Sequence, residues 1–341
     1  MFRAFQAKPG IPHPRAFVRR RVRRQRSNPR YRIAAWCALT CLCPLLFQSF
    51  APPSDNIALG AQSGGSPSLS IHQSPPPQPA GKPLHPQEAR PPMAVKSKIA
   101  LVEDAKTSEV LLAKNVDRVV PIASITKLMT AIVTLDAKLP LEEMLTISDD
   151  DRDKVMGTSS RLRVGWSLSR TDMLHLALMS SENRAAAALS RNYPGGCTAF
   201  ISAMNAKAAE LGMSQTHFAN ANGLTNENVS TASDLFKLVQ AAYQYPLIRL
   251  YSTDQGYLVR VGKRALPYFN SNSLVGRSDW DIDVQKTGFT NEAGDCLVMR
   301  VNVEGRPLVM IFLDAYGKLT RFADARRVRA QLAAARKELV P

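Results

Sequence analysis

A serine and a lysine that lie three residues apart could form a nucleophile with its own base. They are Ser124 and Lys127, in the stretch PIASITKLMT. Positions i and i+3 lie on one face of a helix, so the hydroxyl and the amine would be neighbours. A serine attacks well only when a base takes its proton, and a lysine is such a base only if its pKa falls. Since this pair recurs by chance, a capping serine with a surface lysine is the alternative interpretation.

Two further groups of polar residues could complete a site around that pair. Ser181 and Asn183 lie two residues apart in SSENRAA, at a predicted junction between helices. Lys286 and Thr287 precede Gly288 in a strand-like run. A glycine in a strand allows a ligand to approach the backbone closely. The second lysine could lower the pKa of the first, and the threonine could donate to a carboxylate.

The remaining reactive residues suggest no competing chemistry. His175 and His217 are the only histidines after residue 95, and each has apolar neighbours, so we expect structural roles for both. No group of Cys, His and Asp has the spacing of a metal site, and no glycine-rich phosphate loop precedes a helix. We therefore expect no metal and no cofactor. Nothing in the sequence brings Cys197 and Cys296 together, and whether they pair stays open.

The order of predicted elements after residue 95 indicates an α+β fold. Strand patterns cover 98–104, 108–115, 256–262, 283–289 and 296–315. Helical patterns cover 124–137, 170–179, 182–192, 198–211, 230–244 and 319–339. Because strands come first and last, we predict an antiparallel sheet built from both chain ends, with a largely helical insert. The apolar stripe of the last helix should pack on that sheet.

The first 95 residues read as an export segment and a linker. Residues 1–33 hold eleven Lys and Arg and no acid, and the uncharged stretch Ile33–Phe50 follows. This is the layout of a secretory signal, and the stretch is also long enough to span a bilayer. We predict an export signal or membrane anchor in 1–50, a Pro/Ser/Gly-rich linker in 51–95, and a domain in 96–341 that works in the periplasm.

The net charge of +16 belongs mainly to that N-terminus. From Lys96 onward the net charge is only about +5. The folded part therefore lacks the strongly basic balance that nucleic-acid-binding domains show, and we expect no nucleic-acid partner.

Taken together, the three groups match a known signature. S-x-x-K, S-x-N and K-T-G in this order mark penicillin-binding proteins and class A β-lactamases. Residues 96–341 resemble the low-molecular-mass penicillin-binding proteins of the D-alanyl-D-alanine carboxypeptidase group. The stretches MSSENRAAA, KTGFTNEAGDCLVMR and LDAYGKLTRFADA are similar to the D-alanyl-D-alanine endopeptidases of the penicillin-binding protein 7 type. The resemblance implies a β-lactamase/transpeptidase-like fold with a DD-peptidase catalytic domain.

The resemblance also implies roles for the first two groups. Ser124 would attack the peptide carbonyl and become acylated, with Lys127 as its general base. Ser181 would pass a proton to the leaving amine. Asn183 would hold Lys127 and a substrate amide, whereas Glu182 between them is expected to point away.

The third group would bind the substrate. Lys286 and Thr287 would hold the carboxylate beside the scissile bond. The backbone N–H groups of Ser124 and of Phe289, which follows Gly288, would form the oxyanion hole.

The implied substrate is the peptide of peptidoglycan. By resemblance, the chain would hydrolyse cross-links between D-Ala and diaminopimelate and would bind β-lactam antibiotics covalently. A D-Ala-D-Ala carboxypeptidase is the alternative. A class A β-lactamase would need an E-x-x-L-N loop, and the stretch around Glu227 lacks that pattern. A non-catalytic receptor is disfavoured because all three groups are intact.

Overall fold

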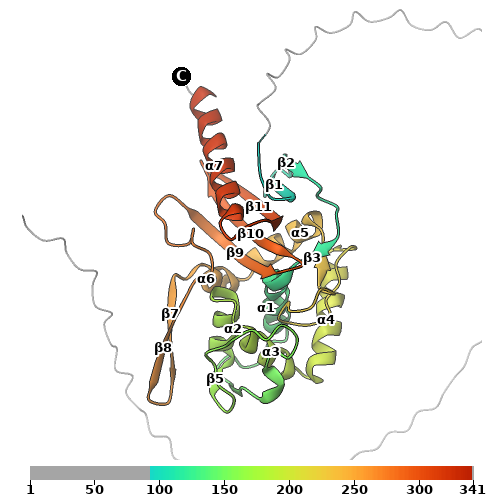
Figure 1. Ribbon diagram of the computed structural model, residues 1–341, viewed down its shortest axis with the longest axis vertical. Coiled ribbons are helices and arrows are strands. Elements are labelled where there is room, and N and C mark those ends of the chain that lie inside the picture. The colour runs from blue at the N-terminus through green and yellow to red at the C-terminus, as the bar shows by residue number, and fades with distance from the viewer. Residues whose placement is uncertain (1–92, 340–341) are drawn as a thin grey trace, which may run out of the picture. The chain divides into compact units, whose positions relative to one another are not determined.

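The computed structural model describes residues 93–339 (Figure 1). The predicted export segment and nearly all of the predicted linker lie outside these residues. Within 93–339, no helix combines the length and the apolar character that crossing a membrane requires.

The centre of the fold is a five-stranded antiparallel sheet with the order β2-β1-β11-β10-β9. Its strands are β1 (Ile99–Asp104), β2 (Val110–Lys114), β9 (Asp281–Thr290), β10 (Gly294–Val303) and β11 (Arg306–Ala315). Ile99 of the first strand pairs with Leu313 of the last, so both chain ends share one sheet. The predicted α+β plan is confirmed, and β9 lies at one edge.

In the described residues, the larger helical segments of the insert lie between β2 and β9. They are η1 (Ala123–Thr126), α1 (Lys127–Asp136), α2 (Arg170–Met179), α3 (Asn183–Arg191), α4 (Gly196–Glu210), α5 (Ala232–Tyr243) and α6 (Pro246–Thr253). Local sequence sets several of their ends. Ser169 and Asp172 form a capping box at the start of α2, and Thr231 caps α5 by accepting from Asp234 N at 3.1 Å.

Alternation along the strands gives the sheet two apolar faces. Val298 of β10 belongs to the core shared with the helical insert, whereas its neighbours Leu297 and Met299 belong to a second core. The helix α7 (Thr320–Leu339) covers this second face with Phe322 and Val328 (Figure 1). The predicted packing of the last helix on the sheet is confirmed.

The first described residues run beside α7. The backbone N–H groups of Lys96 and Ser97 donate to the Asp324 carboxylate at 2.9 and 2.7 Å. Arg327 Nε donates to the carbonyl of Ala94 at 3.2 Å. Asp324 is fully buried, so this contact fixes where the chain joins the fold.

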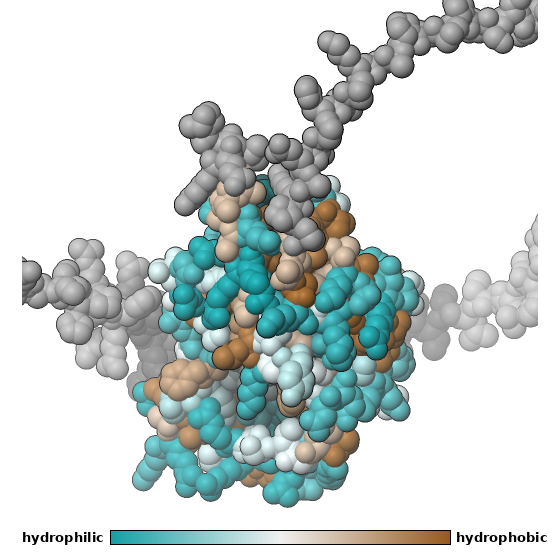
Figure 2. Space-filling view, turned by 45° about the horizontal axis from the view of Figure 1, so that its top comes forward, coloured by the Kyte–Doolittle hydropathy of each residue, from teal (hydrophilic) through white to brown (hydrophobic). Residues whose placement is uncertain are grey.

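Short strands connect the larger elements. They are β3 (Val120–Pro121), which pairs with β6 (Val229–Ser230), β4 (Met144–Thr146), which pairs with β5 (Ser167–Ser169), and β7 (Gly256–Val261), which pairs with β8 (Arg264–Phe269). The segment η2 (Asp149–Asp151) is a single 3-10 turn. The β7–β8 hairpin projects from the body of the domain (Figure 1). Hydrophilic residues dominate the face in Figure 2, where hydrophobic residues form only small groups.

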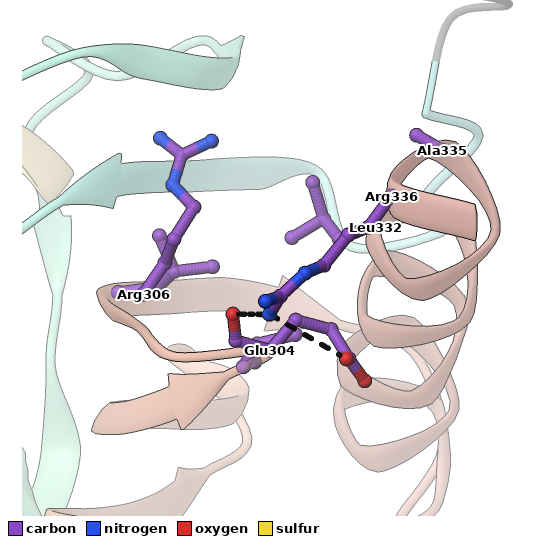
Figure 3. Close-up of a pocket in the computed structure, with 7 residues that line it drawn as sticks. Glu304, Arg306, Leu332, Ala335 and Arg336 are labelled. Atoms are coloured by element: carbon purple, nitrogen blue, oxygen red, sulfur yellow. Dashed lines mark hydrogen bonds and ion pairs between the residues drawn. The ribbon is translucent and has the colours of Figure 1, made fainter. Parts of the chain in front are cut away.

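A pocket of about 340 Å³ lies between the β10–β11 turn and α7 (Figure 3). Its lining consists of Val303, Glu304, Arg306, Leu308, Leu332, Ala335 and Arg336. Arg336 donates to the backbone carbonyl of Glu304 across it. Glu304 follows Val303, the end of β10 that is farther from Cys296, and Cys296 pairs with Gly288. This pocket is therefore separate from the three groups of polar residues.

Candidate active site

Ser124 and Lys127 meet at the junction of η1 and α1. Lys127 Nζ donates to Ser124 Oγ at 2.8 Å, as the three-residue spacing predicts. Ile122, Ile125 and Leu128 around them are fully buried. Burial of these apolar side chains holds the turn against the core and fixes the direction of the hydroxyl.

Lys127 is buried and has three oxygen partners. Besides Ser124, its Nζ donates to Asn183 Oδ1 at 2.7 Å and to the backbone carbonyl of Asn222 at 2.5 Å. Burial lowers the pKa of Lys127 to about 7, because an apolar setting disfavours the ammonium, and the charge of Glu182 opposes this shift. A large fraction of the amine is therefore neutral near pH 7. Burial, and not the charge of the predicted second lysine, is the main cause of the lowered pKa of Lys127.

The third group lies on the edge strand β9, beside η1. The Lys286 side chain is buried and donates to the Thr287 carbonyl at 3.0 Å, and Thr287 Oγ1 donates to Ser271 Oγ at 2.7 Å. Burial and then the charge of Lys127 lower the pKa of Lys286 well below its ordinary value. The charges of the two lysines therefore interact, but the lowered pKa that results is that of Lys286 and not, as the sequence hypothesis had it, that of Lys127.

Gly288 sets the distance between β9 and the nucleophile. A Cβ at this position would lie 3.1 Å from the Ile122 carbonyl and 3.2 Å from Ser124 N. These contacts are tighter than a side chain normally accepts. The glycine therefore allows the edge strand to approach the nucleophile turn closely. Phe289 follows it with a side chain that is 56% exposed.

Two of the predicted site's residues or their direct neighbours adopt left-handed backbone angles without glycine's freedom. Ala123, directly before the nucleophile, has φ +47°, and Ser181 has φ +61° at the turn from α2 to α3. Such angles cost free energy and persist only where packing enforces them. Gly223 supplies that packing at Ala123, because a Cβ at Gly223 would overlap the Ala123 carbonyl.

Sequence reasoning missed several residues that complete the site. Asn222 contacts Lys127 through its backbone carbonyl, and the type of a residue does not predict such a backbone contact. Thr158 Oγ1 accepts from Asn183 Nδ2 at 3.0 Å from a distant loop. Arg321 of α7 pairs with Asp295, and its charge contributes to lowering the pKa of Lys286. None of these contacts follows from a local pattern.

Glu182, expected to point away from the site, lies at the start of α3. The residue is buried and caps α3 by accepting from Arg184 N at 3.2 Å. Its charge raises the pKa of Lys127. Glu182 therefore belongs to the surroundings of the base.

The histidines and cysteines lie outside the site. His175 is stacked on Tyr251 and tilted against Tyr257, with ring centroids 4.4 and 4.1 Å away. His217 pairs through its backbone with Val229. Both positions agree with structural roles. The two cysteines of the described part, exposed Cys197 and buried Cys296, are free thiols.

Comparisons with known proteins agree with this arrangement. The family described as D-alanyl-D-alanine carboxypeptidase matches residues 85–317. A D-alanyl-D-alanine endopeptidase of Pseudomonas aeruginosa is 50% identical over 274 residues, which cover 80% of this chain and 86% of that protein. One of Escherichia coli is 51% identical over 232 residues, covering 67% and 75% of the two chains.

Solved structures show the same fold. The Streptomyces K15 DD-transpeptidase superimposes with a TM-score of 0.67 at 26% identity, covering 72% of this chain and 99% of that one. Penicillin-binding protein D2 of Listeria monocytogenes, in its cefotaxime-bound form, superimposes with a TM-score of 0.64 at 30% identity. The match covers 71% of this chain and 98% of that one. Fold, arrangement of the three groups and sequence lead to one conclusion: the chain belongs to the D-alanyl-D-alanine carboxypeptidase family.

Proposed function

We propose that this chain is a serine DD-peptidase that hydrolyses peptide cross-links in bacterial peptidoglycan through an acyl-enzyme on Ser124. One observation carries the proposal. The buried amine of Lys127 lies 2.8 Å from Ser124 Oγ, and its pKa is lowered to about 7. A base with a pKa near the working pH is what proton removal from a serine requires.

Acylation proceeds in two steps on these groups. Lys127 Nζ takes the hydroxyl proton while Ser124 Oγ bonds to the peptide carbonyl carbon. The backbone N–H groups of Ser124 and Phe289 donate hydrogen bonds to the oxyanion that forms. The carbon–nitrogen bond then breaks, and the leaving amine takes the proton from Lys127 through Ser181. Water repeats the sequence on the ester and releases Ser124, with Asn183 keeping the amine in place throughout.

A carboxylate beside the scissile bond is the recognition feature of the substrate. Lys286 and Thr287 lie together on β9 and would bind it, with Arg321 nearby as a further cation. Burial and neighbouring cations lower the pKa of Lys286, and a bound carboxylate would raise it again. Substrate binding therefore favours the charged form of this lysine.

Endopeptidase activity is favoured over carboxypeptidase activity by the similarity of the relatives. Those at 50% and 51% identity are named endopeptidases. The Bacillus subtilis carboxypeptidase DacF is 29% identical over 60% of this chain. A cross-link to the D-centre of diaminopimelate presents a carboxylate beside the scissile amide, as D-Ala-D-Ala does. The same groups could read both substrates.

The location and the inhibitors follow from the same proposal. A bacterial cell-wall peptidase must reach peptidoglycan, so the basic and apolar segment of residues 1–50 would export the domain to the periplasm and contact the membrane at least during export. A β-lactam carries a strained amide beside a carboxylate and would acylate Ser124. The cefotaxime-bound Listeria relative supports this expectation.

Digestion of purified cross-linked peptidoglycan by the full chain in detergent tests the proposal. We expect cross-linked dimers to become monomers, and chromatography with mass detection would measure this conversion. Ser124→Ala should abolish the reaction. If pentapeptides lose D-Ala while dimers persist, the carboxypeptidase alternative replaces the endopeptidase. If penicillin labels a residue other than Ser124, the mechanism itself is wrong.

A further inference from the structure

A short loop beside the site is held in a fixed shape. This segment, residues 153–158 and here called the rim loop, lies between η2 and β5. The Asp153 carboxylate accepts from the backbone N–H groups of Val155 and Met156, both at 2.9 Å, and of Thr158 at 2.7 Å. Three such bonds to one side chain fix the local backbone. The loop therefore presents its side chains in a defined direction.

The rim loop is in direct contact with the catalytic groups. Asn183 Nδ2 donates to Thr158 Oγ1 at 3.0 Å, while Asn183 Oδ1 accepts from Lys127. Only one side chain thus separates the loop from the proposed general base. The loop therefore borders the candidate site on the side of Asn183.

The rim loop carries two adjacent apolar side chains on the surface. Val155 is 73% exposed and Met156 is 39% exposed. An isolated exposed apolar residue needs no explanation, but these two lie on a fixed loop beside a substrate site. Covering them with an aliphatic ligand group would gain free energy in proportion to the area removed from water.

We propose that the rim loop binds the second peptide of a cross-linked substrate, with Val155 and Met156 packing against its aliphatic parts. The inference rests on the proposed endopeptidase function. A cross-link continues past the scissile amide into the methylene chain of diaminopimelate and the alanine methyl groups of the other peptide. A pentapeptide ends there in a single D-Ala. The rim loop therefore selects cross-links over free peptide ends.

The double variant Val155→Ser with Met156→Ser tests this in the full chain. Both side chains are exposed, so the fold should tolerate the change. We expect kcat/KM for a purified cross-linked muropeptide dimer to fall roughly tenfold, the scale of losing apolar contacts in a binding site. Penicillin acylation and pentapeptide hydrolysis should stay within about twofold, because neither ligand has the second peptide.

A matched control separates this effect from a general loss of surface apolar groups. Val110→Ser with Leu258→Ser removes side chains that are 53% and 48% exposed on β2 and β7. This control should cleave dimers at the unchanged rate. The inference is overturned if both double variants lose activity equally, or if the rim variant cleaves dimers as well as the unaltered chain. If the unaltered chain is acylated by penicillin but leaves dimers intact, the proposed function falls and the inference falls with it.

Discussion

The protonation of one buried amine controls the proposed chemistry. Lys127 must be neutral to accept the Ser124 proton, and burial lowers its pKa to about 7. The neutral fraction grows as pH rises through this value. We expect the acylation rate with a fluorescent penicillin to rise about tenfold per pH unit below 7 and to level off above it. A rate that falls as pH rises from 6 to 8 would contradict the assignment of Lys127 as base.

Two neighbours of this amine should affect the midpoint of that profile differently. The charge of Glu182 raises the pKa of Lys127, so Glu182→Gln should move the midpoint to lower pH while an amide oxygen still caps α3. Burial is the main cause of the lowered pKa, so Lys286→Met, which keeps an apolar side chain there, should leave the midpoint near 7. The pH profile of acylation measures both. An upward shift in Lys286→Met would restore the second lysine as the main cause.

At the residue scale, local spacing predicts only part of the site. The contact between Ser124 and Lys127 follows from helical geometry, because three residues bring two side chains to one face. The contact of Lys127 with Asn183 joins residues 56 positions apart, and only the resemblance to a family anticipated it. The Asn222 carbonyl could not be foreseen, since every residue has one. The catalytic roles themselves stay predictions.

Because of close packing between elements, substitution by alanine should destabilise the fold much more at one glycine than at another. Gly212 and Gly223 both have positive φ, +69° and +80°, but a Cβ would meet open space at Gly212 and lie 2.9 Å from Ser124 N at Gly223. Gly212→Ala should lower the free energy of unfolding by about 1–2 kcal/mol through its backbone angle alone. Gly223→Ala should cost roughly 2–5 kcal/mol, because overpacking adds to that strain.

Urea unfolding and penicillin acylation would measure this pair. We expect Gly223→Ala to slow acylation as well, since the nucleophile turn must shift, and Gly212→Ala to leave the rate unchanged. Equal losses of stability in the two variants would show that the contact with Ala123 is not restrictive.

At the scale of elements, the sequence predicted helices and strands correctly where their apolar pattern is strong, and it missed elements with a weak pattern. The sheet strands and α7 agree with the sequence because burial on one or both faces imposes apolar spacing. The helix α6 was missed because only eight residues form it, although Pro246 at its first turn suits a helix start. The strand β8 was missed because Arg264 and Pro267 obscure alternation in a largely exposed hairpin.

The helix α7 covers one apolar face of the sheet, although the family match ends before it. Removing the helix by ending the chain at Gly317 would expose the second apolar face of the sheet, including Val102, Met310 and Phe312. We expect this shortened chain to aggregate and to lose penicillin labelling. A chain that ends at Arg336 keeps the packed part of α7 and should label normally. A soluble, labelled product from the first truncation would show that α7 is dispensable.

The contact between Asp324 and the first described residues also has a mechanical consequence. Tension carried by the preceding chain reaches the fold at Ala94–Ser97, where Asp324 and Arg327 transfer the load to α7. From there it bears first on β1 and on the face of the sheet that α7 covers. Ser124 and Lys127 lie in the helical insert, on the other face. A pull on the chain would therefore load the sheet before it distorts the distance between nucleophile and base.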